Sequence, residues 1–419
     1  MNSNQGTFAR PLDVRHGEPQ PRVSELALRT RIQRVRDAMT TEGLAALVVF
    51  GSPRALGSRS RTAGYIQYLA GWMSRPTAAA LVLPRDGAAS ILTLGPHDTR
   101  EFALRSSWLG DVIRTGDVLR HGTAAAEALV RAGIEPGSRI GLVGVDELPH
   151  PAYRAVEAAL GPYELIDAEG LLDRLRLTRD PEEVDMLRVS ARISDAMIAA
   201  GMAEASRPGA SGPSIMAEVE HRGRLLGADP AACWLAVGEA PPTTYFEFME
   251  LPNGVGPSDR VQIGTTAAYE GYFGQCLRMG VRGRASAQLT EFSDILLSIQ
   301  DAALEAMKPG TPLHVVSDVI ESMIDEHAPY SRSSDPFRFQ SCHGLGLSYS
   351  EPGMAESLSP ARDRSRDASG ICLEPNMVIE VHPNFTVPGL GCIVAGDMAL
   401  VTAQGAEWIT ESPRGLWAI

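Results

Sequence analysis

The sequence predicts an α/β protein of two domains preceded by a polar arm. In the first half, short apolar runs alternate with amphipathic segments of helical period, which is typical of an α/β domain. From Asp180 an aspartate, a proline and two glutamates follow one another, the pattern of a helix N-cap and first turn, which predicts the start of a long helix. We therefore expect an arm over residues 1–25, a first domain over 26–172 and a second over 173–419.

Each expected element follows from the spacing of apolar residues and from its ends. In the first domain, residues 27–43 predict an amphipathic helix ended by Gly43, and a second helix covers residues 121–133. The apolar runs there predict buried strands over residues 44–50, 78–84, 88–94 and 139–145. In the second domain we expect strands over residues 259–266, 272–281, 376–385 and 398–404, and helices over residues 291–307 and 313–327.

Composition and charge narrow the possible partners. The chain has 38 Lys and Arg against 51 Asp and Glu, a net charge of −13, which argues against nucleic acid and anionic membranes as partners. Lys308 is the only lysine, so no GxxxxGK[ST] phosphate loop is present. The five cysteines include no CxxC pair, and the first 22 residues contain no apolar stretch of a signal peptide. We therefore expect a cytoplasmic protein with reduced thiols and no membrane-spanning segment.

A set of phrases in a fixed order resembles one protein family. The phrases are "DPEEVDMLR", "AAYEGYFGQCLR", "CHGLGLSYSEP", "LEPNMVIEVHP" and "GDMALVTAQG". Their order and spacing are similar to those of the pita-bread family, which includes methionine aminopeptidase, aminopeptidase P, prolidase, creatinase and ectoine hydrolase. The segment "GYIQYLAGWMSRPTAAALVLPRDG" resembles the N-terminal domain of the creatinase and prolidase branch. The resemblance covers nearly all of the chain after the arm and implies a creatinase-type α/β domain followed by a pita-bread domain of α+β type.

The resemblance implies a metal site, but most of its ligands are absent. Peptidases of this family hold two divalent metals with two Asp, one His and two Glu. The matching phrases place the Asp positions at Gly264 and Gln275, the His at His343 and the Glu positions at His382 and Gly396. Because one ligand of five matches, we expect no ordinary two-metal cluster. The pocket then resembles those of creatinase and ectoine hydrolase, which work without the metal pair.

Three side chains are the first candidates for acid–base catalysis. His343 can carry a proton near neutral pH, although a buried structural histidine is the alternative. Glu380 and His382 are two residues apart on an expected strand, so both point to one face of the sheet. There the carboxylate can orient the imidazole or raise its pKa. The alternative for Glu380 is a solvated or salt-bridged strand residue.

Glu247 is the fourth catalytic candidate. The resemblance places it where relatives usually carry a His that contacts the substrate, with Glu250 as the alternative position. In an apolar, aromatic segment, a glutamate can have a raised pKa and act as an acid or a base. A loop glutamate that faces water is the other interpretation.

Five further residues are candidates for binding the substrate. Arg75 matches the position at which creatinase binds the substrate carboxylate across a dimer, and a guanidinium can pair with both carboxylate oxygens. Gln275 offers a neutral donor and acceptor. Arg278, which matches a framework position, completes the polar set, and Tyr245 and Trp72 are expected as pocket walls. A surface arginine and aromatic core packing are the simpler alternatives for Arg75 and for the two aromatic residues.

Together these residues favour a metal-independent enzyme that uses side-chain acid–base catalysis and no cofactor. It would act on a C–N bond of a small, nitrogen-rich zwitterion that carries a carboxylate. One alternative is a mononuclear enzyme with Zn or Fe held by His343, Glu380 and His382. The others are a lyase, cyclase or isomerase on the same fold and a non-catalytic binding protein. The resemblance also implies a homodimer, because the N-terminal domain of this branch usually covers the partner's site.

Overall fold

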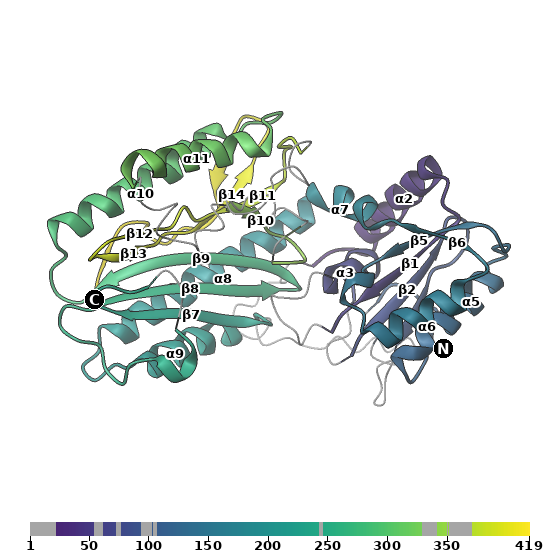
Figure 1. Cartoon of the computed structure of the whole chain (residues 1–419), viewed down its shortest axis with the longest axis horizontal. Helices are drawn as coiled ribbons and strands as arrows, with labels where there is room; N and C mark the ends of the chain where they lie inside the picture. The colour runs from purple at the N-terminus through teal and green to yellow at the C-terminus, as the bar shows by residue number, and fades with distance from the viewer. Residues whose placement is uncertain are drawn as a thin grey trace. The chain divides into compact units, whose positions relative to one another are not determined.

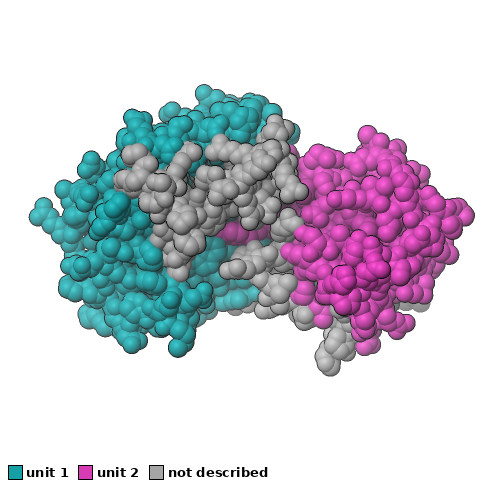
Figure 2. Space-filling view, viewed as in Figure 1, with its two compact units in different colours: residues 1–22, 183–343, 354–419 teal, residues 23–182, 344–353 magenta. Residues whose placement is uncertain are grey.

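A computed structural model describes residues 22–53, 62–72, 77–93, 103, 107–242, 246–328, 342–349, 351 and 371–419. Contacts divide the chain into two compact units, coloured separately in Figure 2. Unit 2 holds Val23–Glu182 and a short later segment that begins at Gly344, and unit 1 holds the rest of the described chain. The division therefore falls after Glu182 and not at residue 172.

Unit 2 is built on one mixed sheet of six strands in the order β4-β3-β2-β1-β5-β6. The strands are β1 (Ala46–Gly51), β2 (Ala79–Pro84), β3 (Ser90–Thr93), β4 (Val112–Arg114), β5 (Arg139–Val143) and β6 (Glu164–Asp167). The helices are α2 (Glu25–Glu42), α3 (Ala63–Ala70), α5 (His121–Arg131), α6 (His150–Leu160) and α7 (Glu169–Leu177), with short 3₁₀ turns at Val118–Arg120 and Val145–Glu147. Strand β1 runs antiparallel to β2 and parallel to β5, and α5 and α6 bury their apolar faces against this sheet (Figure 1).

Unit 1 combines two four-stranded sheets and a hairpin with four helices. The sheet orders are β16-β9-β8-β7 and β10-β11-β14-β15, and β12 pairs with β13. The helices are α8 (Pro181–Ala205), which starts at the end of unit 2, α9 (Gly212–Leu225), α10 (Ala287–Ala306) and α11 (Leu313–His327), with a 3₁₀ turn η4 (Phe248–Glu250). The strands are β7 (Ala231–Gly238), β8 (Arg260–Tyr269), β9 (Tyr272–Val281), β10 (Cys342–Gly344), β11 (Val378–Val381), β12 (Phe385–Val387), β13 (Gly391–Ile393), β14 (Asp397–Val401), β15 (Ala406–Trp408) and β16 (Trp417–Ala418).

The long helix α8 lies directly on the β8–β9 hairpin, as Figure 1 shows. The Ser190 hydroxyl donates to the Tyr272 carbonyl at 2.7 Å and accepts from the Tyr269 N–H at 3.2 Å. A Cβ on Gly274 would lie 2.6 Å from the Ser190 backbone, so glycine is what allows helix and strand to approach this closely. This contact fixes the hairpin that carries part of the candidate site.

Helix ends explain where the elements differ from expectation. Helix α2 ends at Gly43, as expected, because this residue adopts φ 68° and its N–H bonds back to the last turn. Helix α10 begins at Ala287 and not at Glu291, since the Ser286 hydroxyl accepts from the Leu289 N–H at 3.1 Å and caps the helix earlier.

A buried ion cluster holds the later segment within unit 2. Glu351 pairs with Arg176 at 3.1 Å and with Arg179 at 3.0 Å, and all three side chains are at most 2% exposed. Arg179 also donates to the Leu345 carbonyl at 3.0 Å, and Arg176 donates to the Ser348 hydroxyl at 3.0 Å. Glu351 is therefore the counter-charge for two buried guanidinium groups.

Candidate functional site

Two rows of side chains cross four strands on one face of unit 1. Antiparallel pairing places Thr266 of β8 opposite Gln275 of β9, and Gly264 opposite Leu277. A bridge joins Leu277 to Gly396, with N–H to carbonyl distances of 3.1 and 3.0 Å, and so links β9 to the start of β14. Side chains that face each other across antiparallel strands lie on the same side of a sheet, so these positions share one face.

The pairing of β11 with β14 extends both rows. Glu380 pairs with Met398, and Val381, the last residue of β11, pairs with Asp397. His382 follows directly, and continuing the same register by one residue would set it opposite Gly396. The first row is thus Thr266, Gln275, Met398 and Glu380, and the second row is Gly264, Leu277, Gly396 and His382. The expectation that Glu380 and His382 share a face follows from this register.

Two imidazoles meet at the end of the second row. The rings of His343, on β10, and His382 lie 5.2 Å apart between centroids with an interplanar angle of 62°. His343 is 0% exposed and His382 is 8% exposed. Burial, with a smaller contribution from His343, lowers the pKa of His382 to about 3. His382 is therefore neutral at pH 7, and its Nε2 has no hydrogen-bond partner among the described residues.

The first row ends in a buried carboxyl group. Glu380 is 0% exposed, and neither of its carboxyl oxygens has a hydrogen-bond partner in the described chain. Burial, and then the nearby Asp397, raise the pKa of Glu380 well above its ordinary value. Gln275 is 1% exposed, and its side-chain oxygen likewise lacks a partner there. The carboxyl of Glu380 does not orient His382, since no interaction joins the two side chains.

Arg278 is a structural residue and not the substrate-binding residue that we expected. It forms a fully buried ion pair with Asp397 at 2.6 Å. Its remaining donors go to backbone carbonyls at 2.8 Å, those of Leu277, Gly396, Ser412 and Pro413. All five guanidinium N–H groups therefore have acceptors inside the protein. Asp397 points away from the two rows, as its place on β14 predicts.

The remaining sequence candidates do not gather with these residues. Glu247 is exposed and precedes η4, so the expected apolar setting is wrong; its neighbour Phe248 is itself 58% exposed. Trp72 is a buried core residue of unit 2, 3% exposed. Arg75 and Tyr245 lie outside the described residues. Sequence reasoning missed Thr266, which its place two residues after Gly264 on the same strand face could have indicated.

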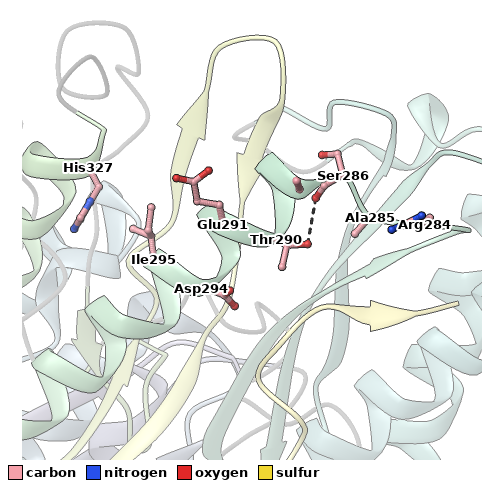
Figure 3. Close-up of a pocket in the computed structure, with 9 residues that line it drawn as sticks. Arg284, Ala285, Ser286, Thr290, Glu291, Asp294, Ile295 and His327 are labelled. Atoms are coloured by element: carbon pink, nitrogen blue, oxygen red, sulfur yellow. Dashed lines mark hydrogen bonds between the residues drawn. The ribbon is translucent and has the colours of Figure 1, made fainter.

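A separate pocket of about 1160 Å³ opens at the start of α10 (Figure 3). Its lining mixes both charges and contains none of the candidate site residues; it comprises Arg284, Ala285, Ser286, Ala287, Thr290, Glu291, Asp294, Ile295 and His327. The dashed bond in Figure 3 is the helical contact from the Thr290 hydroxyl to the Ser286 carbonyl at 3.1 Å. Because it holds no unpartnered catalytic group, this pocket is not the candidate site.

Two protein-family models match the chain, one in each of its two units. The creatinase/prolidase N-terminal domain matches residues 31–178, and metallopeptidase family M24 matches residues 185–403. The chain belongs to metallopeptidase family M24. This confirms the resemblance to the pita-bread family and the fold of a creatinase-type N-terminal domain followed by a pita-bread domain.

Individual relatives agree with this family. The chain is 25% identical to a Xaa-Pro dipeptidase of Pyrococcus furiosus, over 59% of this chain and 67% of that protein. It is 26% identical to a Xaa-Pro aminopeptidase of Escherichia coli, over 60% of each chain. In structure it is similar to a Xaa-Pro dipeptidase from Bacillus anthracis, with a TM-score of 0.73 and 23% identity over 94% of this chain and 100% of that one.

These findings correct two expectations. A metal-independent enzyme without a cofactor is contradicted, because the family is one of metallopeptidases and the relatives are named as peptidases. An enzyme family of hydrolases is supported. No helix in the described part of the chain is both long and apolar enough to span a membrane.

The residues of this chain do not fit the two-metal cluster of the family. Gly264 and Gly396 have no side chain to offer, and a Cβ on Gly396 would lie 2.6 Å from the Glu380 Oε1. Within the described ranges, no three His, Cys, Asp or Glu side chains are grouped to hold a metal, so His343, Glu380 and His382 do not form the expected triad. The two imidazoles are the metal-binding groups that lie close together here, and with one further donor they suit at most one cation.

Proposed function

We propose that the chain is a hydrolase of a C–N bond of amide type that uses one divalent cation, zinc or iron, at His343 and His382. The observation that carries this proposal is the buried imidazole pair. A histidine must be neutral to bind a metal. His382 has a pKa of about 3, so it is neutral at pH 7, and its Nε2 lacks a hydrogen-bond partner in the described chain. The relatives named as Xaa-Pro dipeptidase and aminopeptidase support an amide-type bond.

The polar side chains of this site would hold the cation, and the apolar ones would exclude water. A divalent cation held at this site would supply a Lewis acid for an amide carbonyl. His343 and His382 would hold that cation from one side, and the Gln275 oxygen, on the same face, would serve as a third donor. The apolar cover supplied by Leu277 and Met398 would exclude bulk water and strengthen these interactions.

Metal content tests this proposal directly. Tag-free protein dialysed without chelator should hold about one equivalent of zinc or iron by plasma mass spectrometry. His382→Ala should lose it, whereas the matched control His314→Ala, at an exposed position of α11, should keep it. Less than a tenth of an equivalent, or about two equivalents, would contradict a single-cation site. Amine release from small amides and dipeptides by the loaded protein then tests hydrolysis.

A non-catalytic binding protein is the second candidate, favoured by the glycines at 264 and 396. If the protein holds one metal but releases amine from no amide or dipeptide, this candidate replaces the first. We also propose a cytoplasmic homodimer with a small substrate that carries a carboxylate, in keeping with Arg75 and the reduced thiols. Light scattering during size exclusion measures the oligomeric state.

A further inference from the structure

Glu380 carries a buried acidic group that nothing in the described structure uses. Its side chain is 0% exposed, and both carboxyl oxygens lack hydrogen-bond partners among the described residues. A buried carboxyl group without a partner is costly, because it loses its hydration and gains nothing in return. A buried carboxyl group of this kind indicates a ligand that donates hydrogen bonds to it.

The arginine whose charge acts on Glu380 is already paired with other groups. Arg278 pairs with Asp397 at 2.6 Å, and its other donors go to backbone carbonyls, so it has no N–H left for Glu380. Asp397 adds a like charge beside Glu380 and not a compensating one. The missing partner is therefore a hydrogen-bond donor, and a positively charged donor satisfies the carboxylate best.

A second polar group in the same row lacks a partner. The Thr266 hydroxyl is buried at 0% exposure and has no hydrogen-bond partner in the described chain. It stands at the opposite end of the first row from Glu380, with Gln275 and Met398 between them. Strands lie about 4.8 Å apart, so the row offers polar contacts at both ends of a span of about 14 Å.

We infer that Glu380 binds an ammonium or guanidinium group of the substrate. This inference rests on the proposed function, because it names the substrate class for that same site. Position 380 lies about 7 Å along the strand from position 382, where the proposal places the reacting centre. The substrate is then an amide whose basic nitrogen lies about that far from the cleaved bond, which makes Glu380 a determinant of specificity.

The carboxyl group of Glu380 lies close to Gly396. A Cβ on Gly396 would lie 2.6 Å from the Glu380 Oε1 and 2.5 Å from the Leu277 Cδ1. Gly396→Ala therefore displaces the carboxyl group without removing it. If Glu380 binds the cation, this variant should weaken binding although every polar atom is still present.

Calorimetric titration of the whole protein with propylguanidinium tests the inference, with butyramide as an uncharged probe of similar size. The wild type should bind propylguanidinium at least about tenfold more tightly than butyramide, since a hydrogen bond to a charged group contributes that much. Glu380→Gln should abolish this preference, whereas the matched exposed control Glu305→Gln, on α10, should retain it. Gly396→Ala should also reduce it.

The outcomes separate this inference from the proposed function. Equal binding of the two probes by the wild type, or an unchanged preference in Glu380→Gln, overturns the inference; the wild-type comparison needs no variant to fold. A protein that binds propylguanidinium through Glu380 but holds no metal overturns the proposed function and leaves this inference in place. A protein that holds one metal but shows no preference for propylguanidinium over butyramide supports the proposed function and overturns this inference.

Discussion

Replacing Asp397 with asparagine removes the counter-charge of a fully buried arginine. Asp397 and Arg278 are both 0% exposed and are joined by contacts of 2.6 and 3.2 Å. Asp397 also accepts hydrogen bonds from the Thr410 hydroxyl at 2.7 Å and from the Gln300 amide at 3.2 Å. The substitution keeps the volume of the side chain but leaves the guanidinium without a compensating charge.

The expected cost is a loss of about 3–5 kcal/mol in the free energy of unfolding, because breaking one partner of a buried ion pair strands the other charge. Against a typical total of about 5–15 kcal/mol, this is a large part of the stability. The hydrogen bonds that Arg278 makes to four backbone carbonyls soften the loss but do not supply a negative charge.

Urea unfolding followed by circular dichroism measures this cost. Asp301→Asn is the matched control in the same unit: its partner Arg414 lies at 2.6 Å, but the two side chains are 60% and 24% exposed. The control should cost less than about 1 kcal/mol, because water screens an exposed pair. A cost for Asp397→Asn no larger than that of the control would refute the structural role given to Arg278.

Three further predictions follow from buried and exposed groups. The pKa of His382 falls from 6.5 in the unfolded chain to about 3 in the folded one, so below pH 6.5 the unfolded state binds a proton that the folded state does not. The free energy of unfolding of the metal-free protein, measured with urea, should therefore fall by about 2 kcal/mol between pH 7 and 5. The fall in His382→Gln should be smaller. In the ligand-free protein the pKa of Glu380 is raised above its ordinary 4.5, so the folded state keeps a proton that the unfolded state releases. The stability of the ligand-free protein should therefore fall as the pH rises above 4.5, and an equal fall in Glu380→Gln would contradict this. Of the five cysteines only Cys372 is exposed, so Ellman's reagent should modify one thiol rapidly in the native protein and none in Cys372→Ser.

Local signals in the sequence predicted the elements and the faces of the site well. The helix end at Gly43 depends on one residue, and the shared face of Glu380 and His382 depends only on the two-residue period of a strand. Both are properties of neighbours in the chain, so the sequence alone is enough to infer them.

Long-range contacts account for what the sequence did not predict. The structural role of Arg278 depends on carbonyls of Ser412 and Pro413, more than a hundred residues further on. The isolation of Glu380 depends on Arg278 having committed its donors to those groups and to Asp397. The exposure of Glu247 depends on how its loop projects from the fold, which no local period encodes.

The ion cluster around Glu351 has a consequence for the order in which the protein is made. Arg176 and Arg179 are synthesised long before Glu351, the buried carboxylate with which both of them pair in the folded protein. A fragment that ends at Glu182 would contain the whole six-stranded sheet but would lack the Glu351 carboxylate. Arg179 would then lose its pairing with Glu351, and Arg176 would keep only its longer contact of 4.0 Å to Asp173. We therefore expect the N-terminal fragment to be less stable than the same unit in the whole chain, because the later segment of unit 2 supplies the Glu351 carboxylate.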